Sequence, residues 1–411
     1  MKLYKRENYL SKIRGFYHAN DLIKVITGVR RCGKSSILQM ISEELVEEGV
    51  PEKNIIYINL DKRGFKNIVT DDALDELIEK ISKGIKGTKY LFIDEIQNVK
   101  NFELVVNGYR EEGDYSIFIT GSNSYLLSGE LMTKLTGRYL EFEIFTLTYE
   151  EYIGMKEFYK MPIDNIPQRE LDNYIICGGF PRTLFFDTTN EKRTYVKGII
   201  EEIFKKDIKK RVIIRNKTVF DLVKNYIINN YGSTMSINNI FDGLNKNGLN
   251  VSKRTVIKYL SYLIDAKLLY ECERFDMKSR RMLAGEKKYY LTDLSLTSIT
   301  NPDSRINYGP ALENMVYLYA RSKNYEVSVG RIGKLECDFI LKDIWLNYSY
   351  VQVAFTILSS RETEDREYAS LESIKDNYPK YVVTTDYLIQ KRNGIKHVNL
   401  FDFMMKGELF K

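Results

Sequence analysis

The sequence predicts a mixed α/β fold, in which a parallel sheet covered by helices on both faces is followed by two further units. Up to residue 145, short apolar runs alternate with amphipathic helical stretches, a pattern typical of such a sheet. Residues 216–295 read as helix, turn, helix and two short strands, and residues 309–411 begin with a helix and continue with strands. A chain of 411 residues has room for two or three domains.

Composition argues against a membrane-spanning protein, a secreted protein and one built on disulfides or zinc. Hydrophobic residues make up 44% and charged residues 29%, and no apolar run reaches eighteen residues, so we expect a globular protein with no transmembrane helix and no membrane partner. The first residues lack the apolar core of a signal peptide, and the four cysteines are far apart, which favours reduced thiols in the cytoplasm over disulfides or a zinc site. The net charge of +6 permits contact with nucleic acid without requiring it.

The first apolar run, residues 23–27, leads into the motif G-x-x-x-x-G-K-S at residues 28–35, and a helical stretch follows at 36–48. This is the pattern of a phosphate-binding loop, in which glycines allow a tight turn and successive N–H groups contact an anion. Lys34 is predicted to contact the β- and γ-phosphates of a nucleotide and the Ser35 hydroxyl to hold Mg²⁺, so we expect ATP and Mg²⁺ as cofactors. The predicted nucleotide-binding residues here are Gly28, Val29, Arg30, Arg31, Cys32, Gly33, Lys34, Ser35 and Ser36.

A second apolar run, residues 90–95, ends in two carboxylates, Asp94 and Glu95. Buried parallel strands open at their carboxyl ends onto the ligand crevice of such sheets. Asp94 is therefore predicted to hold Mg²⁺ through water, and Glu95 to orient or deprotonate the attacking water. The pair favours hydrolysis over simple nucleotide binding, because binding alone does not need Glu95.

Two other predicted strands, residues 55–60 and 115–124, also have polar side chains towards their ends. Asn59 is predicted to sense the γ-phosphate by holding Glu95. Thr120 and Ser122 are candidates for a second γ-phosphate sensor, the alternative being an ordinary turn rich in small residues.

These segments, together with Gly137 and Arg138, resemble AAA+ ATPases, and the runs at 28–31, 119–122 and 174–181 resemble one prokaryotic branch of them. In that branch an AAA+ core precedes a C-terminal winged helix and a nuclease-like fold. The resemblance implies a P-loop ATPase core at 1–150, a helical lid at 151–215, a winged helix at 216–300 and a degenerate PD-(D/E)xK nuclease-like domain at 301–411. It also implies that other copies of the chain are candidate partners, in a homo-oligomer.

The resemblance implies two further site residues. Arg138 would be an arginine finger acting on a neighbouring chain, or a phosphate-sensing arginine within its own chain, and its alternative is a surface arginine. Pro181 would lie near the base, in a nucleotide-sensing turn of the lid, and the alternative is a helix-ending turn. The stretch 191–215 mixes basic residues with Glu201, Glu202 and Asp207, which is typical of a solvated helix rather than a binding strip.

The C-terminal half carries two candidate contacts with DNA. In a winged helix, one group of side chains would face the major groove and another the DNA backbone, although many winged helices only contact proteins. The first group is Ser252, Lys253, Arg254 and Lys258, and the second is Lys278, Arg280 and Arg281.

In the last hundred residues, Glu313, Asp338 and Gln352 match the nuclease layout, but Ala354 stands where a lysine is expected. Such nucleases need carboxylates for Mg²⁺ and a cation beside the attacking water, so we expect no cleavage of DNA. The sequence thus predicts a Mg²⁺-dependent ATPase that couples hydrolysis to its C-terminal region. An ATP-switched DNA-binding regulator and an ATP-dependent nuclease remain alternatives.

Overall fold

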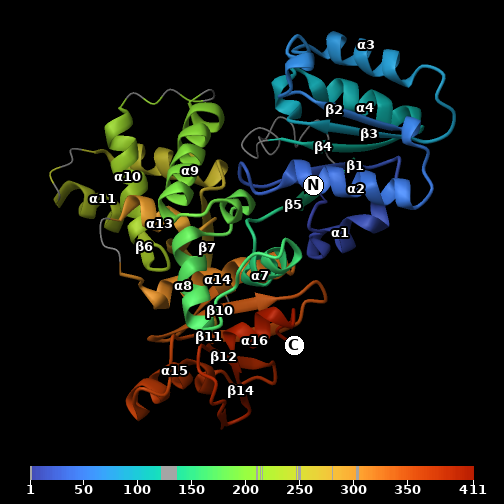
Figure 1. Ribbon diagram of the computed structural model, residues 1–411. Coiled ribbons are helices and arrows are strands. Elements are labelled where there is room, and N and C mark those ends of the chain that lie inside the picture. Colours follow the sequence, from blue (N-terminus) through green and yellow to red (C-terminus); the bar gives the residue numbers. More distant parts are fainter. Residues whose placement is uncertain are drawn as a thin grey trace. The chain divides into compact units, whose positions relative to one another are not determined.

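The computed structural model describes residues 2–121, 137–209, 212, 214, 216–246, 248, 251–279, 281–301 and 305–411 (Figure 1). The chain divides into two compact units. The first comprises Met1–Phe145 and Glu202–Arg211, and the second comprises Thr146–Glu201 and Val212–Lys411.

In the described residues, the first unit contains a sheet of five parallel strands in the order β2-β3-β4-β1-β5. Every residue of β1 and β4 is buried, as expected for parallel strands covered on both faces. Because β1 lies between β4 and β5, its carboxyl end is at the point where the strand order reverses, the usual ligand site of such sheets. The strands are β1 Ile23–Thr27, β2 Ile55–Asn59, β3 Lys89–Asp94, β4 Tyr115–Thr120 and β5 Tyr139–Glu143.

Helices cover both faces of this sheet (Figure 1). On one face, α3 (Asp71–Ser82) and α4 (Phe102–Glu112) bury apolar side chains against β1, β2, β3 and β4. The other face is covered by α1 (Glu7–Ile13) and α2 (Lys34–Glu47), the helix that follows the glycine-rich loop. The chain returns to this unit at η6, a π-helix over Ile203–Ile208.

The second unit is built on a sheet of nine strands, counted over the described residues, in the order β13-β14-β12-β11-β10-β9-β7-β8-β6. A parallel pairing of β7 with β9, in which Arg274 faces Val329, joins the hairpin β7–β8 to the C-terminal strands. The sheet therefore runs across the domain boundary expected at residue 300. Its strands are β6 Thr234–Ser236, β7 Leu269–Asp276, β8 Arg281–Leu291, β9 Glu326–Ile332, β10 Leu335–Lys342, β11 Tyr348–Val353, β12 Lys380–Thr384, β13 Lys391–Arg392 and β14 Ile395–Asn399.

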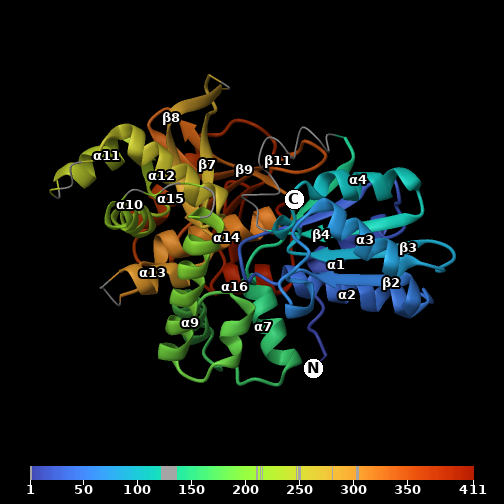
Figure 2. The ribbon, with the colours of Figure 1, turned by 90° about the horizontal axis from the view of Figure 1, so that it is seen from above.

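Two helices of the second unit, α7 and α12, begin at side-chain caps. Thr148 and Glu151 form a capping box at the start of α7, and the Ser252 hydroxyl accepts from Thr255 N at the start of α12. Figure 2 shows α10, α11 and α12 gathered beside β7 and β8. The helices are α7 Tyr149–Phe158, α8 Pro167–Cys177, α9 Thr189–Glu202, α10 Lys217–Asn229, α11 Ile237–Lys246, α12 Lys253–Asp265, α13 Ser295–Thr300, α14 Tyr308–Ser322, α15 Arg361–Ser373 and α16 Leu400–Met405.

Within the described part of the chain, none of these helices combines the length and apolar character needed to cross a membrane.

Candidate nucleotide-binding site

The loop between β1 and α2 requires glycine at both ends. Gly28 has a φ of +142°, and a Cβ there would lie 2.2 Å from the carbonyl oxygen of Ile144 and 2.8 Å from Cys32 Sγ. Gly33, with a φ of +111°, is the left-handed residue from which α2 begins. The loop therefore leads directly into the free N–H groups of a helix start, which is the arrangement that binds phosphate.

The predicted loop residues surround this turn. Val29 and Cys32 are buried, and Cys32 N donates to Val29 O at 3.2 Å. Lys34 is also buried, and its ammonium donates to Gly28 O at 3.0 Å and to Val29 O at 3.2 Å. Ser35 and Ser36 are half-buried in the first turn of α2. The ammonium thus lies inside the loop, where this motif binds phosphates.

Asp94, at the end of β3, is buried and held from two neighbouring strands. Its Oδ2 accepts from Asn59 Nδ2 at 2.8 Å, and its Oδ1 accepts from the Thr120 hydroxyl. Burial raises the pKa of Asp94, while hydrogen bonds from Thr120 and Ser35 act in the opposite direction. Asp94 and the Ser35 hydroxyl therefore lie together as hard oxygen ligands, the kind that Mg²⁺ prefers.

Glu95 follows with a φ of +61°, a conformation uncommon for a residue with a side chain. Its N–H donates to Thr120 Oγ1 at 3.1 Å, and its carboxylate accepts from Gln97 Nε2. Thr120 thereby bridges the backbone of Glu95 and the carboxylate of Asp94.

The prediction that Asn59 holds Glu95 is wrong, because the Asn59 amide donates to Asp94 instead. The reason is register: Asn59 pairs with Asp94 between β2 and β3, and paired residues of parallel strands point to the same face. Gln97 holds Glu95 instead, a contact that no sequence pattern indicated. Ser122, the other predicted sensor, lies outside the described residues.

Arg138 lies at the amino ends of the strands, whereas the loop follows the carboxyl end of β1. Its carbonyl oxygen accepts from Ile23 N at 3.0 Å, at the start of β1, and its Nη1 donates to Asn107 Oδ1 at 3.3 Å. Gly28 is five residues beyond Ile23 along β1, which is about 16 Å at the usual rise per residue of a strand. Arg138 is therefore too far from the phosphate loop of its own chain to contact it.

The loop arginines contact η6. Arg30 donates from Nε and Nη2 to Asp207 at 3.0 and 2.9 Å, and both side chains are buried. Burial alone lowers the pKa of the Arg30 guanidinium, but the hydrogen bond and charge of Asp207 raise it above its ordinary value. Arg31 pairs with Glu202 at 3.2 Å on a more exposed surface. The interpretation of 191–215 as a solvated helix is therefore wrong at Asp207, which has a buried cationic partner.

Pro181 belongs to the second unit, at the start of a short 3₁₀-helix, Pro181–Phe185. The preceding turn is fixed by the buried Asp293, whose Oδ2 accepts from Gly179 N at 2.8 Å. A Cβ on Gly178 would lie 1.8 Å from Asp293 Oδ1, so this position requires glycine. The role of Pro181 near a base stays a prediction.

The candidate DNA-contacting side chains follow α12 and the β7–β8 hairpin. Lys253, Arg254 and Lys258 are exposed on α12, as are Lys278 and Arg281 around the hairpin turn. Ser252 caps α12, so its hydroxyl is already used by the backbone. Arg280 lies outside the described residues.

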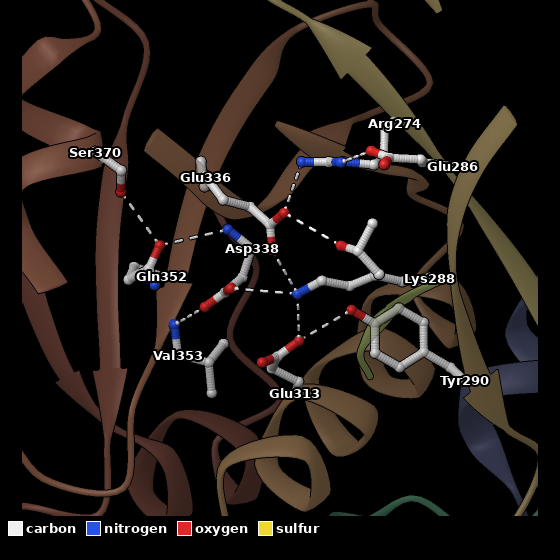
Figure 3. A network of polar contacts seen from close by, with 12 residues as sticks. Arg274, Glu286, Lys288, Tyr290, Glu313, Glu336, Asp338, Gln352, Val353 and Ser370 are labelled. Carbon is white, nitrogen blue, oxygen red and sulfur yellow. Dashed lines mark hydrogen bonds and ion pairs between the residues drawn. The ribbon is translucent and has the colours of Figure 1, made fainter. Parts of the chain in front are cut away.

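The three residues that match the nuclease layout do not converge on one point. Glu313 and Asp338 converge on the ammonium of Lys288, whereas Gln352 contacts Ser370 and the backbone N–H of Asp338 (Figure 3). Gln352 also donates from Nε2 to Glu367. A β-bulge between Cys337 and Ile340 falls at Asp338, and bulges re-aim side chains in this way. Lys288 was not among the predicted residues, because it comes from an earlier strand, β8.

Comparison with known proteins agrees with this geometry. Residues 20–153 match a protein family described as AAA domain, and residues 168–302 match a domain of unknown function. An uncharacterised protein of Haemophilus influenzae is 32% identical over 402 residues, which are 98% of each chain. An uncharacterised protein of Methanocaldococcus jannaschii is 33% identical over 375 residues, covering 86% of this chain and 79% of that protein.

Among solved structures, a Walker-type ATPase of Pyrococcus abyssi has the same fold, with a TM-score of 0.52 and 14% identity over 72% of this chain and 96% of its own. The predicted α/β fold with a P-loop NTPase sheet is therefore confirmed.

Proposed function

This chain belongs to the same family as the Haemophilus influenzae and Methanocaldococcus jannaschii proteins and contains an AAA domain, and from this premise we propose that it is a Mg²⁺-dependent ATPase. The reaction is the hydrolysis of ATP to ADP and phosphate. The observation that carries the proposal is that Lys34 and Ser35 follow β1, while Asp94 ends β3 and Glu95 comes directly after it. A protein that only bound nucleotide would not need Glu95.

Each residue at the ends of β1 and β3 has a separate role in the proposed reaction. Lys34 and the loop N–H groups bind the phosphates, and the oxygens of Ser35 and Asp94 fit Mg²⁺, which would neutralise phosphate charge. Glu95 orients and deprotonates the attacking water, and Gln97 fixes the direction of its carboxylate.

Phosphate release from ATP tests the proposal. Turnover is expected to require Mg²⁺ and to disappear with EDTA, and Lys34→Ala is expected to weaken nucleotide binding itself. Lys83→Ala, an exposed lysine that follows α3, serves as the matched control. Unchanged binding and turnover in Lys34→Ala would contradict the assignment of this loop.

We further propose that nucleotide state reaches the C-terminal half through residues 202–211. This segment lies in the first unit, yet it connects α9 to α10 of the second, and its Asp207 holds Arg30 of the loop. The phosphates of ATP would compete with Asp207 for the Arg30 guanidinium, because both are anions suited to a planar bidentate donor.

A second candidate function is ATP-switched DNA binding. The elements α10, β6, α11, α12, β7 and β8 follow each other in the order of a winged helix, and exposed cations lie on α12 and the hairpin turn. Replacing Lys253 and Arg254 together by Ala is expected to weaken duplex binding about tenfold or more and to flatten its salt dependence.

Lys197→Ala, on the exposed side of α9, is the control for this experiment. Equal affinity of the double variant and the control for DNA would direct the search towards a protein partner. If ATP alters DNA affinity equally in the wild type and in Glu95→Gln, the nucleotide acts as a switch and its hydrolysis is not needed for the change.

A further inference from the structure

Lys288 lies among three carboxylates in the second unit, Glu313, Glu336 and Asp338, which we call the carboxylate cluster (Figure 3). The Lys288 Nζ is 2.9 Å from Glu313 Oε2, 2.9 Å from Glu336 Oε1 and 3.7 Å from Asp338 Oδ1. Lys288 comes from β8, Glu313 from α14, and the other two from β10. One ammonium therefore joins three elements that are separate in the sequence.

Each carboxylate of the cluster also accepts a second donor from the protein. Arg274 Nη2 donates to Glu336 Oε2 at 2.9 Å, and the Tyr290 hydroxyl donates to Glu313 Oε2 at 3.1 Å. Val353 N donates to Asp338 Oδ2 at 2.8 Å. Ionised carboxylates only accept hydrogen bonds, so these donors complement the ammonium and fix the orientation of all three groups.

Burial makes a central cation necessary. The side chains of Lys288, Asp338 and Glu313 are 5%, 8% and 16% exposed, whereas that of Glu336 is 31% exposed. A carboxylate as far from water as Asp338 is strongly unfavourable unless it is compensated. Burial raises the pKa of Asp338 and of Glu313. Burial alone lowers the pKa of the Lys288 ammonium, but the charges of Asp338, Glu313 and Glu336 outweigh this effect and raise it.

We propose that the ammonium of Lys288 takes the place of a divalent cation in the carboxylate cluster, so that the cluster is a metal-independent joint between β8, β10 and α14. A divalent ion binds carboxylate oxygens at about 2.0–2.6 Å and would have to displace Nζ from its position between Glu313 and Glu336. Among the described residues, no group of three or more His, Cys, Asp or Glu side chains is arranged to hold a metal ion. This inference concerns the second unit and does not depend on ATP hydrolysis.

Thermal unfolding of the full chain without nucleotide, in EDTA and in Mn²⁺, tests the proposal. Lys288→Ala is expected to unfold at a lower temperature in EDTA and to regain about 5 °C or more with Mn²⁺, because the three carboxylates, no longer held apart around Nζ, can then close on the metal. Adding Asp338→Asn to Lys288→Ala should remove this gain. The matched control is Lys287→Ala, since Lys287 pairs with Glu271 and Glu273 outside the cluster and should give no gain.

If Lys288→Ala fails to fold in EDTA, refolding from urea provides the same test, with recovery expected only when Mn²⁺ is present. Absence of any Mn²⁺ response in Lys288→Ala, by unfolding and by refolding, would overturn the proposal. Stabilisation of the wild type by Mn²⁺ that disappears in Asp338→Asn would also overturn it. Metal-dependent nicking of plasmid DNA that is lost in Asp338→Asn would do the same and would favour a nuclease.

Discussion

Arg30 of the phosphate-binding loop and Asp207 of η6 form a buried pair, with Nε and Nη2 at 3.0 and 2.9 Å from the two carboxylate oxygens. A guanidinium that faces a carboxylate through two nitrogens gives a strong and directional contact. The pair ties the loop to the segment that leads from α9 to α10. The position of this segment therefore depends on an arginine of the loop that, in our proposal, also faces the phosphates.

Asp207→Asn is expected to lower the free energy of unfolding by about 3–5 kcal/mol in the absence of nucleotide, because it leaves the Arg30 guanidinium buried without its counter-charge. The phosphates of a slowly hydrolysed ATP analogue should replace that charge. The analogue is therefore expected to raise the unfolding temperature more in Asp207→Asn than in the wild type, in a thermal unfolding experiment with and without it.

Glu202→Gln is the matched control, because its partner Arg31 is 53% exposed and such pairs contribute less than about 1 kcal/mol. If Asp207→Asn unfolds like the wild type and responds to the analogue to the same extent, the pair does not compete with phosphate.

Glu95→Gln is expected to retain ATP binding and to lower turnover about 10²-fold or more, since the amide cannot accept the proton of the attacking water. The exposed Glu112→Gln, at the end of α4, is the control for loss of a charge elsewhere in the unit. Fluorescent-nucleotide binding and phosphate release separate the two effects. Near-normal turnover in Glu95→Gln would remove this residue from the mechanism.

The buried Lys24 is expected to make the free energy of unfolding depend on pH. Its buried ammonium donates to Ala19 O, Leu22 O and Ser116 Oγ at 2.6, 3.0 and 2.9 Å, and burial lowers its pKa from 10.5 to about 7. Between these values the unfolded chain binds more protons than the folded chain, so the free energy of unfolding rises with pH. Below about pH 7 both states are protonated and this dependence ends.

The measurement is urea unfolding at several pH values from 6 to 9 in the wild type and in Lys24→Met. Above pH 7 the wild type is expected to gain up to about 1.4 kcal/mol per pH unit relative to Lys24→Met, which lacks the titrating group. Lys83→Met, at an exposed position, should behave like the wild type. Parallel pH profiles for the wild type and Lys24→Met would show that Lys24 does not titrate in this range.

The local structure of the candidate nucleotide site could be predicted from the sequence to the extent that its residues are adjacent in the chain. The loop from Gly28 to Ser35 and the pair Asp94–Glu95 are local patterns whose chemistry depends on residue type and spacing. Asn59 was placed on the correct strand but given the wrong partner, because the register between β2 and β3 is a tertiary property.

The charged partners Asp207 and Lys288 could not be predicted for a related reason. Each meets its counter-charge across a large sequence separation, Arg30 in one case and Glu313, Glu336 and Asp338 in the other. From the sequence alone, Asp207 belongs to a mixed charged stretch that is typical of a solvated surface, and Lys288 to a short strand beside a basic loop. The parallel β7–β9 pairing, which carries the sheet past residue 300, likewise leaves no local pattern.

Arg138 lies directly before β5, next to the start of β1. Because Arg138 lies about 16 Å from the loop of its own chain, measured along β1, an arginine finger at this position would have to act on a neighbouring copy. Arg138→Ala alone is expected to lower turnover about 10²-fold or more while ATP binding stays intact. Lys34→Ala alone should be inactive because its own loop cannot bind the phosphates.

Mixing the two inactive variants then distinguishes a finger from a surface arginine. In a random equal mixture, about one quarter of the interfaces pair the loop of an Arg138→Ala chain with the Arg138 of a Lys34→Ala chain. Both parts are intact at these interfaces, so about one quarter of the wild-type rate should return. Arg110→Ala, on neighbouring α4, is the control for disturbing this surface and should retain turnover by itself. Full activity of Arg138→Ala would make Arg138 a surface residue, and an inactive mixture would contradict action on a neighbouring chain.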